Sequence, residues 1–97
     1  MHARVTTISG STDRVDEAIA SYRSEVLPAV TEMGGSGAIL LVDRQSGEAI
    51  SLTLWPDEES MRASEERADQ LRSTVSQQMD AGGQPSVGRF EVVVFET

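Results

Sequence analysis

The sequence predicts an α+β domain in which four antiparallel strands form one sheet and two helices cover one of its faces. Four segments rich in β-branched or alternating apolar residues predict the strands, and two longer segments with apolar residues three and four positions apart predict the helices. The order is β-α-β-β-α-β, and a short turn joins the two middle strands. This order is the ferredoxin-like βαββαβ arrangement. At 97 residues, the chain is expected to form one domain over residues 1–97.

The first half of the chain is predicted to hold one strand and one helix. β-branched residues over 2–9 predict the strand, and the polar residues 11–13 can cap the helix that follows. Pro28 removes a backbone donor, so we expect the helix to kink or to end its regular part near residues 24–28. Apolar spacing predicts the inner face of this helix as Val15, Ala18, Ile19, Tyr22, Val26, Val30 and Met33.

The second half is predicted to hold a hairpin, a helix and a last strand. The hairpin strands span 38–44 and 48–55, and the Gln-Ser-Gly sequence at 45–47 supplies the turn. Asp57 can cap the second helix, and the last strand spans 87–96. The inner face of the second helix is predicted as Met61, Ser64, Ala68, Leu71, Val75 and Met79.

Both faces of the predicted sheet carry apolar residues, although two helices can cover only one face. The third strand alternates between Ile50, Leu52 and Leu54 on one side and Ser51, Thr53 and Trp55 on the other. A monomer would therefore expose a large apolar patch, which a second copy could bury. We expect a homodimer joined through the sheet face, with the even-numbered set of this strand toward the partner.

Composition argues against several classes of function. The net charge of −8 opposes binding to nucleic acid or to an anionic membrane. The chain has no Cys, Lys or Asn, and His2 is its one imidazole, so a multi-histidine or thiolate metal site is not expected. The first residues lack a basic segment followed by an apolar one, so no signal peptide is expected and the protein is predicted to be cytoplasmic.

Three residues interrupt otherwise apolar inner faces: Tyr22, Trp55 and Ser64. One interpretation is that they are core residues with local hydrogen bonds, because buried Tyr and Trp usually find a partner for their polar atom. The other is that they line a small-molecule pocket, since convergent polar groups in an apolar cleft are typical of such sites. The residue types alone leave both interpretations open.

The segment "GSGAILLVDRQSGEAISLTLWPDEESMRASEERADQLR" resembles the antibiotic biosynthesis monooxygenase (ABM) family of dimeric α/β-barrel proteins. The matching features are Gly37, the "LLVDR" strand, the Ser46-Gly47 turn, "LW" at the end of the third strand and "SMRASE" in the second helix. Pro28 and the final "FEVVVFE" fit as well.

The resemblance implies a homodimer with facing sheets and a cavity in each subunit near the end of the third strand. Some members of this family oxidise polycyclic aromatic or quinol-type substrates with O₂ and no metal or flavin. A related branch degrades haem with an Asn, a Trp and a His ligand. This chain has no Asn and no His in its second helix, so neither active pattern is complete.

Among the residues of the family pattern, Trp55 carries over directly, and Ser51 is the nearest polar substitute for the Asn. Tyr22, Ser64 and Arg72 are candidates from helical phase. The expected function is a cofactor-independent monooxygenase that acts on a small aromatic or quinol-like substrate, with these five residues as binding candidates and the catalytic residues unassigned. The alternative is a non-catalytic dimeric protein with a ligand-binding, structural or stress-related role. Neither interpretation requires a metal or cofactor.

Overall fold

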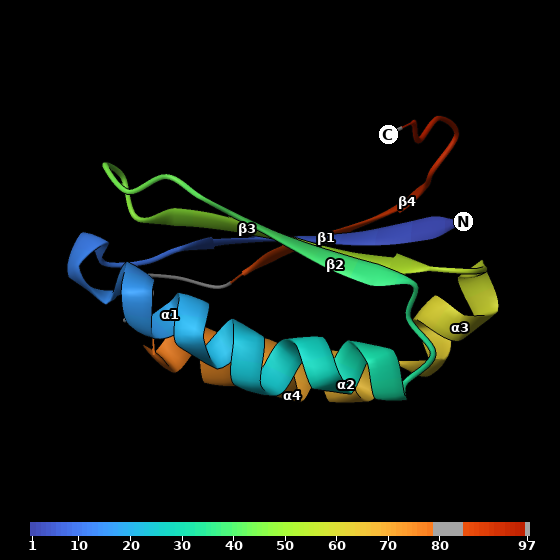
Figure 1. Ribbon diagram of the computed structural model, residues 1–97, viewed down its shortest axis with the longest axis horizontal. Helices are drawn as coiled ribbons and strands as arrows, with labels where there is room; N and C mark the ends of the chain where they lie inside the picture. Colours follow the sequence, from blue (N-terminus) through green and yellow to red (C-terminus); the bar gives the residue numbers. More distant parts are fainter. Residues whose placement is uncertain (79–84, 97) are drawn as a thin grey trace.

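The computed structural model describes residues 1–78 and 85–96, and of residues 75–78 it describes the backbone alone. These residues form one sheet and one layer of helices (Figure 1). The strands are β1 (His2–Ser9), β2 (Gly37–Val42), β3 (Glu48–Trp55) and β4 (Ser86–Glu91). The helical segments are η1 (Thr12–Arg14), α1 (Val15–Ser21), the π-helical segment η2 (Tyr22–Val26), α2 (Leu27–Glu32), α3 (Glu58–Ala63) and α4 (Glu65–Gln78).

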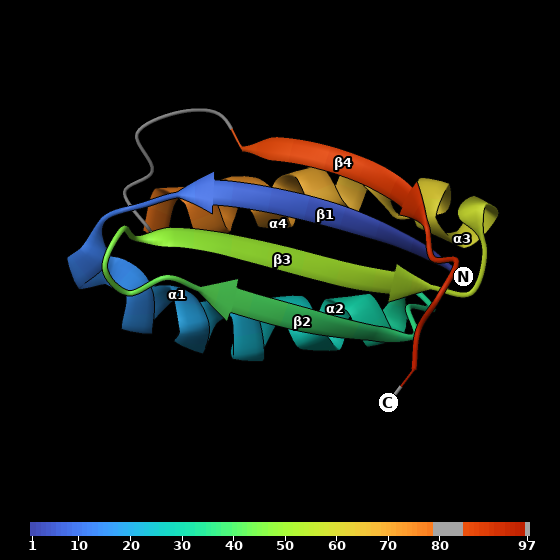
Figure 2. The ribbon, with the colours of Figure 1, turned by 90° about the horizontal axis from the view of Figure 1, so that it is seen from above.

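The sheet has the strand order β2-β3-β1-β4, and every neighbouring pair is antiparallel (Figure 2). This is the ferredoxin-like topology, so the predicted fold class is confirmed. β1 and β3 have the predicted bounds, and both lie in the centre of the sheet. Their register places Arg4 opposite Thr53 and Thr6 opposite Ser51. These two pairs lie next to each other on the face that the helices cover.

The first helix passes Pro28 without ending there. It changes from α-helical to π-helical geometry at Tyr22, and the backbone N–H of Leu27 donates to the carbonyl of Tyr22, five residues earlier. Regular α-helix then resumes and contains Pro28 in its first turn, where a missing backbone donor is tolerated. The interruption begins at residue 22, a little earlier than predicted. The wider π-helical turn comes before the proline, so Pro28 lies at the start of a new α-helical segment, where its missing N–H leaves no helical hydrogen bond unmade.

The second helix is divided into α3 and α4 at Ser64, which the sequence did not predict. Asp57 caps its start as expected, since its carboxylate accepts a hydrogen bond from the backbone N–H of Ser60. The Ser64 hydroxyl donates to the carbonyl of Met61 at 2.7 Å, and this local bond competes with the regular helical pattern. Of the predicted inner face, Met79 lies outside the described residues, as does the side chain of Val75.

The last strand ends earlier than the predicted 87–96. β4 pairs only with β1, and the pairing ends where His2 lies opposite Glu91. One further hydrogen bond joins the Val92 N–H to the carbonyl of Met1. The segment 92–96 then rises from the sheet on the side away from the helices (Figure 1).

The hairpin turn has the predicted glycine in a position that requires it. Gly47 has φ of +81°, a left-handed conformation that side chains disfavour. A Cβ at this position would also overlap the carbonyl oxygen of Gly10, whose N–H donates to the Gly47 carbonyl at 3.1 Å. The turn between β2 and β3 is therefore tied to the turn that leads into the first helix.

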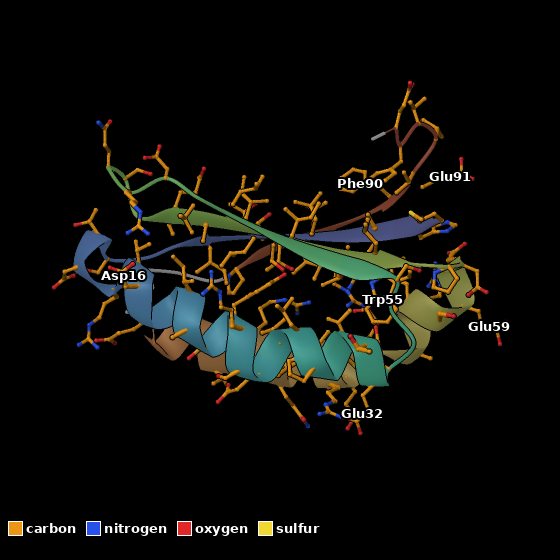
Figure 3. All side chains as sticks on the ribbon, in the orientation of Figure 1. Asp16, Glu32, Trp55, Glu59, Phe90 and Glu91 are labelled. Atoms are coloured by element: carbon orange, nitrogen blue, oxygen red, sulfur yellow. The ribbon has the colours of Figure 1, made fainter. Side chains whose placement is uncertain are left out.

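The core lies between the sheet and the helices, and Trp55 is its largest fully buried side chain. Figure 3 shows Trp55 in this layer and Phe90 on the opposite side of the sheet. The outer face is apolar and uncovered, as the strand patterns predicted. Its exposed large apolar side chains, together with those of the segment after β4, are Ile39, Leu41, Phe90, Val93, Val94 and Phe95.

Candidate functional site

A cavity of about 60 Å³ lies between the sheet and the helices and is partly open to solvent. Most of its wall is aliphatic and comes from β1, β2 and β3 on one side and from α1, η2 and α4 on the other. Its polar lining residues are Arg4, Thr6, Tyr22, Ser51, Thr53 and Arg72. An apolar cavity with a few convergent polar groups is the usual form of a small-molecule site.

Tyr22 and Ser51 form one polar group of the cavity. Their hydroxyl oxygens lie 2.8 Å apart, and either can donate to the other. Burial raises the pKa of Tyr22 above its ordinary value of 10, and the hydrogen bond with Ser51 opposes this only in part. Tyr22 is therefore a neutral phenol at physiological pH. Its hydroxyl also donates to the Ile39 carbonyl at 3.4 Å, a long contact that a better acceptor on a ligand could replace.

Arg4 forms the second polar group and is only 3% exposed. Its Nη2 atom donates to the Met61 carbonyl at 2.7 Å and to the Ser64 hydroxyl at 2.9 Å, and lies 3.2 Å from Oε1 of Glu65. Burial lowers the pKa of Arg4, and the Glu65 carboxylate opposes that effect. Arg4 stays protonated in a protein interior, so the cavity has a positive charge in its wall.

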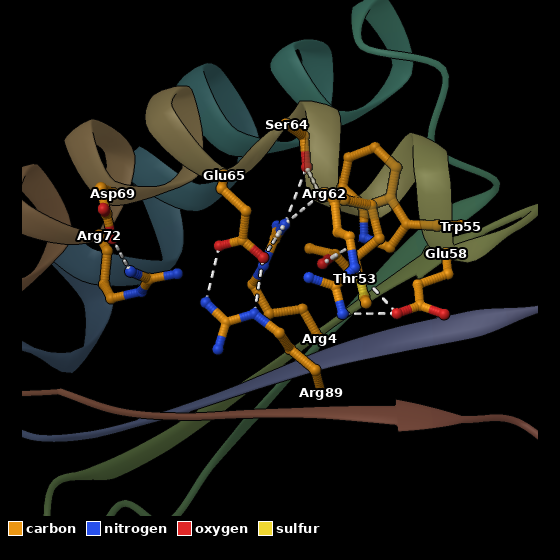
Figure 4. Close-up of polar contacts among 11 residues, drawn as sticks. Arg4, Thr53, Trp55, Glu58, Arg62, Ser64, Glu65, Asp69, Arg72 and Arg89 are labelled. Carbon is orange, nitrogen blue, oxygen red and sulfur yellow. Dashed lines mark hydrogen bonds and ion pairs between the residues drawn. The ribbon is translucent and has the colours of Figure 1, made fainter.

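Glu65 is shared between two arginines (Figure 4). Its two carboxylate oxygens accept from Nε and Nη2 of Arg89 at 2.6 and 2.8 Å, and Oε1 also faces Arg4. The hydrogen bonds from Arg89, helped by the charge of Arg4, lower the pKa of Glu65 from 4.5 to about 2 in spite of its partial burial. This network joins β1, β4 and the start of α4.

Arg72 reaches the cavity from α4 and is 11% exposed. It forms an ion pair with Asp69, one turn earlier on the same helix. Arg4, Arg72 and Arg89 together carry three positive charges against the two negative charges of Glu65 and Asp69. One positive charge therefore remains here, in a chain whose net charge is −8.

Trp55 is a core residue, so the expectation that it lines the cavity is wrong. It is 0% exposed and is not part of the cavity wall. Its indole N–H donates to the Thr53 hydroxyl at 2.9 Å, and the Arg4 guanidinium lies 5.4 Å from the ring centroid, within range of a cation–π interaction. Trp55 therefore contacts two residues of the cavity wall, Thr53 and Arg4, without lining the cavity itself. The cavity follows the middle of β3, at Ala49, Ser51 and Thr53, rather than its end.

Ser64, another predicted binding residue, is also absent from the cavity wall. It is 3% exposed, and its hydroxyl is used by Met61 and Arg4. Tyr22, Ser51 and Arg72, the three remaining candidates, come together in the cavity as the strand parity and helical phase indicated. That they bind a substrate stays a prediction.

Sequence reasoning missed Arg4 and Thr6 as cavity residues; strand parity placed Thr53 on the same side as Ser51, although it was not named as a candidate. A usable signal was present, because Arg4 is a charged residue within a β-branched segment that becomes a central strand. A charge buried in a sheet needs partners, and such groups gather at functional sites. The partners of Arg4 lie about sixty positions away in the chain, so the pattern near Arg4 did not reveal them.

Within residues 1–78 and 85–96, no three His, Asp or Glu side chains gather in a way that could hold a metal ion. In the same part of the chain, no helix is long and apolar enough to cross a membrane.

Solved structures of similar fold cover almost the whole chain. A monooxygenase from the gene ActVA-Orf6 of Streptomyces coelicolor, in complex with nanaomycin D, superposes with a TM-score of 0.76 at 14% identity over 99% of this chain and 92% of that one. The chain has the fold of the antibiotic biosynthesis monooxygenases. The resemblance noted in the sequence is thus confirmed for the fold.

Two further structures show how varied the proteins with this fold are. The heme-degrader MhuD of Mycobacterium tuberculosis, with two hemes bound in its active site, has a TM-score of 0.74 at 20% identity and full coverage of both chains. A dimeric ferredoxin-like protein from an uncultured marine organism has a TM-score of 0.71 at 12% identity, over 99% of this chain and 90% of that one.

Sequence relatives do not add an activity. No family model matches the chain. An uncharacterized protein of Mycobacterium tuberculosis is 39% identical over 93 residues, which are 95% of this chain and 41% of that protein. The chain thus spans about two fifths of the length of this relative.

Proposed function

We propose that the cavity binds a small aromatic or quinol-like molecule and that the protein oxidises it with O₂ as a cofactor-independent monooxygenase. The observation that carries the proposal is the placement of Arg4 and Arg72 in the wall of a mostly apolar cavity. Because a charge interacts more strongly away from bulk water, these guanidinium groups favour the anionic form of a bound phenol or enol. An electron-rich anion of this kind is the form of the substrate that can reduce O₂ directly.

The reaction balances without another reductant. The substrate loses a proton from a carbon next to its ring system, and the carbanion or enolate gives electrons to O₂. One oxygen atom forms the new C=O bond of the product, and the other leaves as water with the two hydrogens that the carbon has lost. The protein orients the substrate and stabilises its anion, while the substrate itself supplies the electrons.

Each polar group has a role in this scheme. Arg4 and Arg72 stabilise the substrate oxyanion, and the Tyr22–Ser51 pair hydrogen-bonds a second substrate oxygen. The aliphatic wall holds the ring. The substrate proton passes to water at the open side of the cavity, since the guanidinium groups lower the pKa of the bound acid. Trp55 and Ser64 act through Arg4 and Thr53, which they contact.

We propose further that the protein is a homodimer joined through the outer face of the sheet. Ile39, Leu41 and Phe90 are exposed on that face, and the apolar segment 92–96 extends beyond it. A dimer interface of the obligate kind buries on the order of 2,000 Å² or more. The dimeric relative of the same fold supports this assembly. We take residues 1–97 as one domain and the cytoplasm as its location.

A second candidate function is ligand binding without turnover. Among the described residues that line the cavity there is no carboxylate and no imidazole, so no evident general base faces the substrate. The neutral Tyr22 phenol, with its raised pKa, does not serve as one. In this alternative the protein would bind and carry an aromatic anion, and the two arginines would provide affinity alone.

Oxygen uptake separates the two functions. A panel of quinols and anthrones is incubated with the protein in air, and product is analysed by mass spectrometry after reaction in ¹⁸O₂. A monooxygenase incorporates one labelled oxygen per product, and the rate falls in Arg72→Gln. Binding in a thermal-shift assay without oxygen uptake for any ligand would favour the carrier and contradict the enzyme.

A further inference from the structure

The Arg4 guanidinium has donors that its protein partners do not use. All three of its polar contacts, with Met61, Ser64 and Glu65, involve Nη2. Its Nε is buried without a hydrogen-bond partner and is out of reach of solvent. Nη1 makes no hydrogen bond within the described residues and is not fully buried, so it is the donor that a ligand in the cavity can reach. A buried cationic N–H without an acceptor is costly, so native proteins rarely leave one unless a ligand, ion or water supplies the acceptor.

The carboxylate nearest to Arg4, that of Glu65, pairs mainly with Arg89. Glu65 accepts two short hydrogen bonds from Arg89, and its contact with Arg4 is the longest of the three. Asp69 similarly pairs with Arg72. The cluster therefore keeps one uncompensated positive charge next to a cavity whose remaining wall is mainly aliphatic. A singly charged anion with an apolar body matches both properties.

We propose that the cavity selects an aromatic carboxylic acid, whose carboxylate binds Arg4 and Arg72 and whose ring hydroxyl binds the Tyr22–Ser51 pair. This inference rests on the proposed function, since it names the substrate class of the same site. A carboxylate matches the planar donor pattern of a guanidinium better than a neutral oxygen does.

The two polar groups lie at different places along the sheet, so one ligand can contact both. Arg4 lies opposite Thr53, and Ser51 is two residues farther along β3, which corresponds to roughly 7 Å of strand. The aliphatic wall between the two groups would hold the ring.

A matched pair of ligands tests the proposal with the unchanged protein. Binding of 4-hydroxybenzoate and of 4-hydroxybenzamide is measured by calorimetry at pH 7, because these compounds differ in charge and hardly in shape. The acid is expected to bind about 10- to 100-fold more tightly, the usual effect of a hydrogen bond to a charged group. Equal affinity, or tighter binding of the amide, would overturn the proposal.

A pair of variants on α4 tests whether the preference for the acid arises at Arg72. Arg72→Gln should remove most of the preference for the acid. Arg67→Gln, which makes the same change on the same helix, is the control, because Arg67 is half exposed and contacts Glu32 away from the cavity. If both variants reduce the preference equally, the effect is long-range charge and the proposal is wrong. Arg4→Gln gives a further test only if its circular dichroism is that of the wild type, and the other measurements stand without it.

The outcome is separable from that of the proposed oxidation. Tight binding of the acid without oxygen uptake would contradict the monooxygenase and leave the carboxylate site intact. Oxidation of neutral quinols, with no preference for acids, would contradict the carboxylate site and leave the monooxygenase intact.

Discussion

Each face of the sheet departs in its own way from that of an ordinary half-buried sheet. The face covered by helices contains Arg4, Thr6 and Thr53, all of them buried. The uncovered face presents apolar side chains, with Leu41 51% exposed and Phe90 57% exposed. A stable monomer would place its polar groups in water and its apolar groups inside.

The buried polar groups on one face and the exposed apolar groups on the other indicate that the two faces bind different partners. Polar groups are retained under the helices although their burial is costly, which is typical of a binding site. Apolar groups are retained on the open face although their exposure is costly, which is typical of a subunit interface. One face is thus suited to a small ligand and the other to a second copy of the chain.

The largest expected effect is on assembly. Leu41→Asp should convert the proposed dimer to a monomer at micromolar concentration, because a two-fold interface would contain the new carboxylate twice, at a cost of several kcal/mol. Sedimentation velocity measures the change. Leu52→Asp, on the same face, should dissociate or unfold the protein as well.

The matched control is Leu27→Asp, because Leu27 is also an exposed leucine but lies on α2, in the layer of helices. It should sediment as the wild type does. A wild-type protein that sediments as a monomer, or a Leu41→Asp variant that still sediments as a dimer, would contradict an interface on the outer face.

The next largest effect is expected in the core of the covered face. Trp55→Ala should lower the free energy of unfolding by about 3–5 kcal/mol, because a fully buried ring is lost together with its contacts to Thr53 and Arg4. Urea denaturation measures this loss. Trp55→Phe keeps a ring but not the hydrogen bond, and should cost about 1–2 kcal/mol. A loss below 1 kcal/mol for Trp55→Ala would mean that the indole is not closely packed.

The Arg4–Glu65–Arg89 network should make stability depend on acid pH. The pKa of Glu65 is about 2 in the folded protein against 4.5 ordinarily, so its contribution is complete above pH 4.5 and is lost as pH falls toward 2. The shift corresponds to about 3–4 kcal/mol, and solvent screening at this partly exposed carboxylate reduces its effect on stability to about 2–3 kcal/mol. Glu65→Gln should lose about this much stability at pH 7 and should have a correspondingly smaller decline below pH 4.5.

Denaturant unfolding at several pH values from 2 to 7 compares the variants. Glu66→Gln is the control, since it removes a carboxylate from the exposed side of the same helix. If Glu65→Gln and Glu66→Gln give the same curve, Glu65 does not hold the two arginines in the manner described.

The smallest effect is expected at the Tyr22–Ser51 pair. The chain has one tyrosine, so the ultraviolet absorbance of tyrosinate reports Tyr22 alone. Tyr22 should titrate above pH 10, and Ser51→Ala should raise its pKa further because the hydrogen bond with Ser51 lowers it. The lost hydrogen bond should cost about 1 kcal/mol of stability. Titration of Tyr22 at or below pH 10 in the folded protein would contradict its burial.

The two central strands could be predicted more accurately than the edge strands or the helices. The bounds of β1 and β3 follow from alternation within eight consecutive residues, a local property of the sequence. The division at Ser64 and the π-helical segment at Tyr22 could not be predicted in the same way. The first depends on a local hydrogen bond beside a buried arginine, and the second on how the chain accommodates Pro28 within a packed layer.

For the site, local periodicity was sufficient for some residues and misleading for others. Ser51 and Tyr22 were found because strand parity and helical phase both point toward the space between the two layers. Trp55 satisfies the same parity, yet Thr53 and Arg4 contact it and it is excluded from the cavity wall. Parity determines the side of a sheet but does not determine the depth of a side chain.

The sequence by itself determined the order of the strands and helices, the apolar character of both sheet faces and the absence of cysteine thiolates. These properties depend on residue types and on spacings of two to four positions. Only the tertiary structure decided that Arg4 is buried beside the cavity and that its hydrogen bonds to other described residues use Nη2 alone. Its partners, Met61 and Ser64, are 57 and 60 positions away. The free energy of a buried charge depends on which distant groups the fold brings within hydrogen-bonding distance, and no local pattern specifies them.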